Sequence, residues 1–99
     1  MKNIVWLNAA KLDLMDIQAY YSEKASPKIA AQLLQRIFQS SSSLTEQPLI
    51  GSPTMDDDIL EWAIPSLNYT LPYQIKGDDI EILRVFHQSQ KKPSKWEEK

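Results

Sequence analysis

The segment that decides the fold is residues 69–87, which read YTLPYQIKGDDIEILRVFH. Its first half alternates between apolar residues and polar residues or proline, which is typical of a strand with one buried face. The apolar positions are Tyr69, Leu71, Tyr73 and Ile75. Turn residues follow at 76–79, as in a β-hairpin. Because Pro72 has no N–H to give to a sheet, its strand is expected to have an edge or a bulge there.

Residues 80–87 predict the second strand of this hairpin. The strand is apolar on both faces, which favours a central place in the sheet. Ile80, Ile82 and Phe86 are expected on one face, and Leu83 and Val85 on the other.

Upstream of the hairpin, the pattern predicts two more strands and two helices. Residues 4–7 (IVWL) and the alternating residues 60–64 are typical of strands. Apolar residues at helical spacing predict a helix of about 15 residues after an N-cap at Asn8, and a second helix after Ser26-Pro27. The stripes are Ala10, Leu14, Ile17 and Tyr21, and then Ala30, Leu34, Ile37, Ser41 and Leu44.

Residues 45–58 predict a loop with prolines and the run Asp56-Asp57-Asp58. The run lacks the ligand alternation and the glycine of a calcium-binding loop, so we expect solvated aspartates and no metal. The order β-α-α-β-β-β, with helices in one block and strands in another, predicts an α+β fold. We expect one domain over residues 1–99, with an antiparallel helical hairpin packed on a small, twisted, mainly antiparallel sheet.

Composition excludes several classes of protein. The 99 residues include no cysteine, one histidine and two widely separated glycines. These counts exclude disulfides, zinc sites with two imidazoles, and glycine-rich phosphate loops. They are compatible with a reducing cytoplasm, and the longest early apolar run is too short to span a membrane. No cofactor is expected.

The net charge of −2 hides an uneven distribution. Residues 1–45 carry five basic and three acidic groups, residues 46–81 one and eight, and residues 82–99 five and two. An acidic middle therefore lies between basic ends, and a partner would be sensitive to that asymmetry.

The sequence resembles the RelE/ParE superfamily of toxins from bacterial type II toxin–antitoxin operons. The resemblance covers nearly the whole chain. It includes the first helix with Asp13-Leu14 and Tyr20, the loop Leu44…Pro48…Gly51-x-Pro53, and Tyr69-x-Leu71-x-Tyr73 followed by ILRVFH at 82–87. It implies a helical hairpin on a mainly antiparallel sheet, and a cytoplasmic growth inhibitor neutralised by a cognate antitoxin in a hetero-oligomer.

The resemblance leaves the cellular target open. RelE-like members cut mRNA on the ribosome, without metal, and ParE-like members poison DNA gyrase. Cleavage of RNA needs a base and cations that stabilise the developing phosphorane charge. The strand positions that resemble the cationic set of RelE-like nucleases hold Glu61, Ala63 and Thr70. We therefore favour a ParE-like gyrase inhibitor that is not an enzyme, over an mRNA endonuclease or an inactive member that only binds its antitoxin.

Candidate residues for binding the target or the antitoxin lie on the strands and in the basic tail, residues 88–99. Arg84 in an apolar strand needs a partner. It either forms a salt bridge within the fold, for example with Glu61 or Glu81, or lines a concave binding face. His87 is an ordinary strand end, a contact or a base, whereas Tyr73 is expected to pack on the sheet with a polar tip. In the tail, Lys91, Lys92 and Trp96 form either a solvated end or a partner-contacting arm.

Overall fold

The computed structural model describes residues 2–89 and residue 96. The elements in chain order are β1 (Asn3–Trp6), α1 (Asn8–Lys24), α2 (Pro27–Ser41), α3 (Ser43–Glu46), β2 (Ser52–Pro53), β3 (Leu60–Ala63), β4 (Tyr69–Lys76), β5 (Asp79–Ile82) and β6 (Phe86–His87). The predicted α+β fold is confirmed. The short elements α3 and β2, within or beside the expected loop, were not predicted.

The sheet has the strand order β1-β5-β4-β3-β2, and β6 pairs with β4. Only the pair β1–β5 is parallel, and the other pairs are antiparallel. The sheet is therefore mainly antiparallel, as predicted, and β4 is its central strand.

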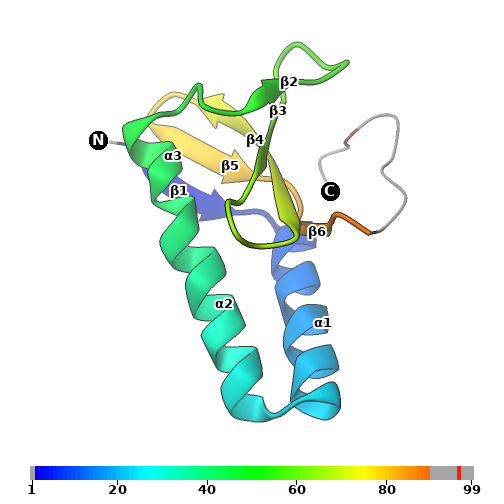
Figure 1. The fold of residues 1–99 in the computed structure, drawn as a ribbon. Helices are drawn as coiled ribbons and strands as arrows, with labels where there is room; N and C mark the ends of the chain where they lie inside the picture. Colours follow the sequence, from blue (N-terminus) through cyan, green and yellow to red (C-terminus); the bar gives the residue numbers. More distant parts are fainter. Residues whose placement is uncertain (1, 90–95, 97–99) are drawn as a thin grey trace.

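The helices α1 and α2 form an antiparallel hairpin that extends beyond the sheet (Figure 1). The predicted start of α2 is confirmed, because Ser26 Oγ accepts a hydrogen bond of 3.1 Å from the N–H of Ile29. The predicted cap of α1 is wrong. Leu7 occupies the N-cap position without a side-chain hydrogen bond, and Asn8 is already helical.

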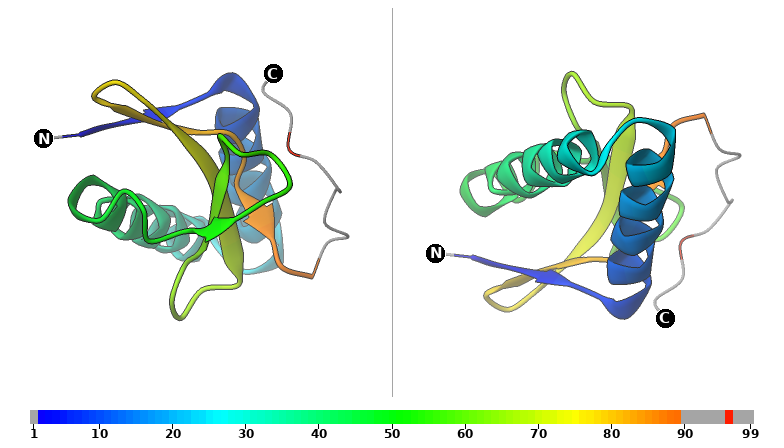
Figure 2. Two further views of the ribbon diagram at one scale, coloured as in Figure 1. Left: turned by 90° about the horizontal axis from the view of Figure 1, so that it is seen from above. Right: turned by 90° about the horizontal axis from the view of Figure 1, so that it is seen from below.

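The inner face of the sheet, which faces the helices, carries the main core. In the views from above and below, the strongly twisted strand β4 runs between α1 and α2 in projection (Figure 2). Both alternating patterns are confirmed, because the apolar residues of β3 and β4 belong to this core. Its buried members are Ala10, Leu14, Ile37, Leu44, Trp62, Ile64, Tyr69, Leu71, Tyr73, Ile80, Ile82 and Val85.

The outer face of the sheet carries a second, smaller cluster. Its buried members are Ile59, Leu83 and Trp96, with Leu7 and Phe86 packed against them. Trp96 is only 4% exposed, and its ring meets that of Phe86 edge to face at 5.0 Å. A residue near the C-terminus therefore closes this face.

The prediction of one continuous strand over residues 80–87 is wrong. Tyr73 pairs with Ile82 and Thr70 pairs with Phe86, so three residues (83–85) lie opposite two (71–72). This is a β-bulge, and it lies opposite Pro72, where the sequence predicted an edge or a bulge. Pro72 accepts a hydrogen bond of 2.8 Å from the N–H of Leu83 but has no N–H to give in return.

The extra residue also changes which face each side chain reaches. Shifting a strand by one residue exchanges its two faces. Val85 consequently joins the inner core with Ile82, and Phe86 joins the outer cluster with Leu83. The predicted assignment of Phe86 and Val85 is therefore reversed, whereas that of Ile80, Ile82 and Leu83 is confirmed.

Candidate functional site

A carboxylate from α1 holds the bulge. Arg84 donates from Nε to Asp13 Oδ2 at 2.7 Å and from its terminal nitrogen to Oδ1 at 3.0 Å. The N–H of Val85, freed from the ladder by the bulge, donates to Asp13 Oδ2 at 2.9 Å. The hydrogen bonds from Arg84 to Asp13 raise the pKa of the guanidinium further. The predicted salt bridge of Arg84 is thus present, but its partner is Asp13 and not Glu61 or Glu81, because the bulge turns residue 84 toward α1.

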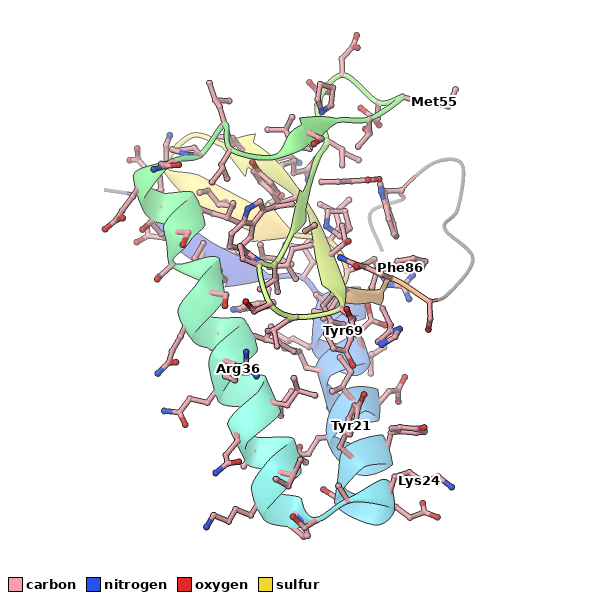
Figure 3. All side chains as sticks on the ribbon, viewed as in Figure 1. Tyr21, Lys24, Arg36, Met55, Tyr69 and Phe86 are labelled. Carbon is pink, nitrogen blue, oxygen red and sulfur yellow. The ribbon has the colours of Figure 1, made fainter. Side chains whose placement is uncertain are left out.

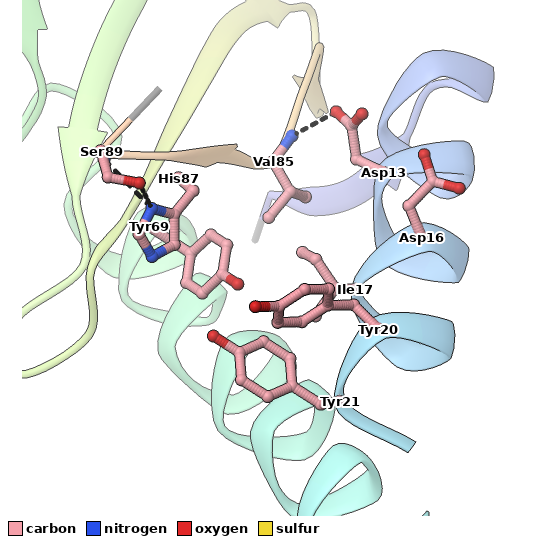
Figure 4. A pocket seen from close by; sticks show the side chains of 9 residues that line it. All are labelled: Asp13, Asp16, Ile17, Tyr20, Tyr21, Tyr69, Val85, His87 and Ser89. Carbon is pink, nitrogen blue, oxygen red and sulfur yellow. Dashed lines mark hydrogen bonds between the residues drawn. The ribbon is translucent and has the colours of Figure 1, made fainter. Parts of the chain in front are cut away.

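Beside this clamp lies a cavity of about 390 Å³ between α1 and strands β4 and β6 (Figure 4). We call it the Asp16 pocket. Its described lining residues are Asp13, Asp16, Ile17, Tyr20, Tyr21, Tyr69, Val85, His87 and Ser89. The lining is therefore aromatic and acidic.

Three tyrosines meet in the Asp16 pocket. The hydroxyl ends of Tyr20 and Tyr21 point toward Tyr69 (Figure 4), and the rings of Tyr20 and Tyr21 form an edge-to-face pair at 5.0 Å. Burial, and then the hydrogen bond and charge of the neighbouring Tyr21, raise the pKa of Tyr69. Tyr69 therefore remains a neutral phenol over the physiological pH range.

A second cavity of about 380 Å³ adjoins the first, and Tyr21, Tyr69 and His87 line both. We call it the Arg36 pocket, because Arg36 of α2 is the charged residue among its described lining, which also includes Ile29, Gln32, Leu33, Ser66, Leu67 and Asn68. Arg36 and Tyr21 come from the two helices of the hairpin (Figure 3). The two pockets form one surface with opposite charges at its two ends, which we call the hairpin–sheet groove.

The groove contains one predicted site residue, His87, and adjoins another, Arg84. The His87 ring lies edge to face on Tyr69 at 5.0 Å. Its Nδ1 accepts a hydrogen bond of 3.0 Å from the N–H of Ser89 and lies 2.5 Å from Ser89 Oγ. The side chain is therefore oriented by the turn that follows β6.

Tyr73 lies in the inner core and is fully buried. Its hydroxyl donates to the carbonyl of Pro48 at 2.6 Å and accepts from the N–H of Gly51 at 3.0 Å. The predicted sheet packing with a polar tip is confirmed. A Cβ at Gly51 would lie 2.8 Å from this tyrosine, so the contact needs glycine. Tyr73 offers no surface to a partner in this structure and instead fixes the loop before β2.

Glu61 and Trp96 lie on the outer face, away from the groove. The indole N–H of Trp96 donates a hydrogen bond to Glu61 Oε2. The structure thus divides the predicted residues into a groove set, Arg84 and His87, and an outer set, Glu61 and Trp96. Lys91 and Lys92 lie outside the described residues.

Sequence reasoning missed the role of Asp13 and Asp16 and of the tyrosine cluster. One signal was available for Asp13. It lies three residues after Ala10 and four before Ile17, at the border of the apolar stripe of α1. A carboxylate at such a position needs a partner. Nothing in the sequence indicated which strand residue would supply it.

No group of three or more potential metal-binding side chains occurs within residues 2–89 and 96. Thr54 Oγ1 accepts from the N–H of Asp56, whose side chain accepts from the N–H of Asp58, so two of the three consecutive aspartates are engaged in loop hydrogen bonds. Over the same described residues, no helix is long and apolar enough to cross a membrane.

Comparisons with known proteins identify a family and a solved structure of similar fold. The model of the family described as ParE toxin of type II toxin-antitoxin system, parDE, matches residues 4–92. Among solved structures, the chain is similar to a chain of the chromosomal ParDE toxin–antitoxin system from P. aeruginosa, with 24% identity and a TM-score of 0.78. The match covers 88% of this chain and 96% of that chain. The search of curated proteins found no match.

Proposed function

The chain belongs to the ParE toxin family of type II toxin–antitoxin systems, and on this premise we propose that it inhibits growth by binding DNA gyrase. In the same proposal, a cognate antitoxin binds the hairpin–sheet groove and holds the toxin inactive. The proposed target places the active protein in the cytoplasm.

The observation that supports binding over RNA cleavage is the state of Arg84. Arg84 donates hydrogen bonds to both carboxylate oxygens of Asp13, and the Arg84 side chain is 39% exposed. A phosphorane would have to compete with that carboxylate for the guanidinium. The described strands β3, β5 and β6 carry no lysine or arginine, so other cations that catalysis would need are not supplied there.

The exposed apolar residues of the hairpin support a protein partner. Tyr20 is 56% exposed and lines the Asp16 pocket, and Ile29 is 47% exposed and lines the Arg36 pocket. Leu12 and Met15 add exposed apolar surface on α1. Apolar surface of this kind, next to pockets with a few charges, is typical of a binding face.

The test is a pair of assays with the purified chain. We expect it to inhibit supercoiling by DNA gyrase and to leave mRNA intact on programmed ribosomes. Equimolar cognate antitoxin should restore supercoiling. Cleaved mRNA would instead support the endonuclease alternative, and no effect in either assay would indicate a member that only binds its antitoxin.

The basic tail is tested by the double variant Lys91→Glu/Lys92→Glu. Deleting residues 91–99 would also remove the buried Trp96, so charge reversal is the sharper change. If the tail contacts gyrase, the variant should need a higher concentration for half inhibition while binding the antitoxin normally. Unchanged inhibition and unchanged antitoxin binding would exclude the two lysines from both contacts.

A further inference from the structure

We propose that the hairpin–sheet groove recognises a partner segment by two charges of opposite sign: an arginine that enters the Asp16 pocket and a carboxylate that meets Arg36. The proposal rests on the proposed function, because it takes the antitoxin as the protein that carries this segment.

The charge balance of the Asp16 pocket favours a cation. Asp13 is one of its two acidic lining residues, and its charge is already compensated by Arg84. Asp16 is exposed, and no hydrogen bond or ion pair engages its carboxylate among the described residues. The described lining includes no lysine or arginine. A cation placed there would meet one available carboxylate and no competing positive side chain of the lining.

The shape and chemistry of the lining favour a guanidinium over an ammonium. Tyr20 and Tyr21 both line the cavity, with an angle of 81° between their rings, and their hydroxyl ends point toward Tyr69 (Figure 4). A planar guanidinium can stack on an aromatic face and donate in its plane to carboxylate and hydroxyl oxygens. An ammonium group has neither the plane nor the fork of donors.

Tyr20 is the residue that the fold itself does not require. It lies outside the inner core and outer cluster, and it is more than half exposed. Its neighbour Tyr21 is half-buried. An exposed aromatic ring at the rim of a pocket can cover the stem of an incoming arginine, which buries apolar surface on both sides.

The Arg36 pocket gives the segment its direction. It adjoins the Asp16 pocket through Tyr21, Tyr69 and His87, which line both. Among the described residues that line the Arg36 pocket, Arg36 carries the charge. A segment that crosses the three shared residues with its arginine toward Asp16 has its other end at the Arg36 pocket, where a carboxylate would meet Arg36. Reversing the segment would place like charges together, which disfavours that orientation.

The first experiment probes the Asp16 pocket without any antitoxin. N-acetyl-arginine amide is titrated into the full chain and the ring resonances of the pocket tyrosines are followed by NMR, with N-acetyl-citrulline amide as the uncharged analogue of the same shape. We expect saturable shifts with the arginine probe and a several-fold weaker response with citrulline or with Asp16→Asn. Equal responses to the two probes, or none, would overturn the proposal even if the antitoxin binds.

The second experiment measures binding of the cognate antitoxin to charge-reversal variants. Asp16→Arg and Arg36→Glu should each weaken binding by about 10- to 100-fold. The matched reversals Asp57→Arg, in the exposed loop, and Lys28→Glu, at the start of α2, should stay within about 3-fold of the unchanged chain. Equal losses for the groove and control variants would contradict the proposal.

The two experiments separate the proposal from the function on which it rests. If the antitoxin binds tightly and neither groove variant weakens it, the charge pattern is wrong and the function stands. If the antitoxin does not bind the unchanged chain, the proposed function fails, and the arginine titration still tests the pocket.

Discussion

The two faces of the sheet are closed in different ways. On the inner face, residues from α1, α2 and α3 cover the sheet, and the core has twelve buried members within the described part of the chain. On the outer face, three buried residues among those that the structure describes form the cluster, and one of them is Trp96. Among the described residues, side chains from three helices close the inner face, whereas a small cluster that includes Trp96 closes the outer face. Removing the same side-chain volume from the two faces should therefore lower the free energy of unfolding by different amounts.

The largest expected effect compares two leucines that are equally buried. Leu71 of β4 lies in the inner core and Leu83 of the bulge lies in the outer cluster, with exposures of 0% and 1%. Leu71→Ala should lower the free energy of unfolding by about 4 kcal/mol, and Leu83→Ala by about 2 kcal/mol, because the outer cluster can collapse more freely around the cavity. Urea denaturation followed by circular dichroism measures both.

The matched pair controls for the chemistry of the substitution, since both changes remove the same atoms. Equal costs at the two positions would show that the outer cluster is as rigid as the inner core. A larger cost at Leu83 than at Leu71 would reverse the comparison.

The second prediction concerns the bulge, which decides which residues reach each face. Asp13→Asn removes the charge that holds Arg84 and weakens the acceptor for the Val85 N–H. Because Arg84 is 39% exposed, water compensates part of the loss, and we expect a destabilisation of about 2 kcal/mol. Thermal unfolding measures it, with Asp16→Asn as the control on the same helix.

A double-mutant cycle with Arg84→Met sharpens this prediction. If the pair acts as a unit, Asp13→Asn should cost less in a chain that already carries Arg84→Met than in the unchanged chain. Additive costs would mean that Asp13 stabilises the bulge through Val85 alone.

Pro72 shows both the reach and the limit of prediction from the sequence. Its missing N–H is a local property, so the sequence could indicate an edge or a bulge at that point. Which partner residues form the bulge depends on the registers of β5 and β6 against β4, and these are set by packing across the whole sheet. Val85 and Phe86 each lie on the face opposite to the one expected, because the registers of β5 and β6 against β4 differ by one residue.

The candidate site was less predictable than the fold for the same reason. Alternation and helical spacing describe one element at a time, and these patterns predicted most of the residues of the inner core. The groove arises where α1 meets β4 and β6, with Asp13 and Arg84 71 positions apart in the chain. The outer contact between Glu61 and Trp96 joins residues 35 positions apart, and no periodicity links them.

The third prediction tests how much of the outer closure depends on one hydrogen bond. Trp96→Phe keeps an aromatic ring beside Phe86 and removes the indole donor to Glu61. We expect a loss of about 1 kcal/mol in the free energy of unfolding, part of it from the smaller ring. Glu61→Gln keeps an acceptor oxygen and should cost less. A greater loss for Glu61→Gln would mean that the carboxylate stabilises the outer face by a route other than Trp96.

The smallest expected effect concerns alkaline pH and the inner face. Burial and the neighbouring Tyr21 raise the pKa of Tyr69, and burial raises that of Tyr73 despite the opposing hydrogen bond from Gly51. Between the unfolded value near 10 and the higher folded values, the unfolded state binds fewer protons than the folded state. The free energy of unfolding is therefore at its full value below pH 10 and falls as the pH rises above it.

Tyr69→Phe removes one of these two titrating groups. Relative to its own stability at pH 8, the variant should lose roughly 0.8 kcal/mol less than the unchanged chain near pH 10.5. Urea denaturation at the two pH values measures the difference, and the use of each protein's own pH 8 value removes the cost of the lost hydroxyl. The outer cluster contains no tyrosine among the described residues, so the alkaline loss reports on the inner face. The contrary outcome is a Tyr69→Phe variant whose stability falls in parallel with that of the unchanged chain. It would show that the Tyr69 phenol ionises as readily in the folded protein as in the unfolded chain. The groove would then be far better hydrated than its burial indicates.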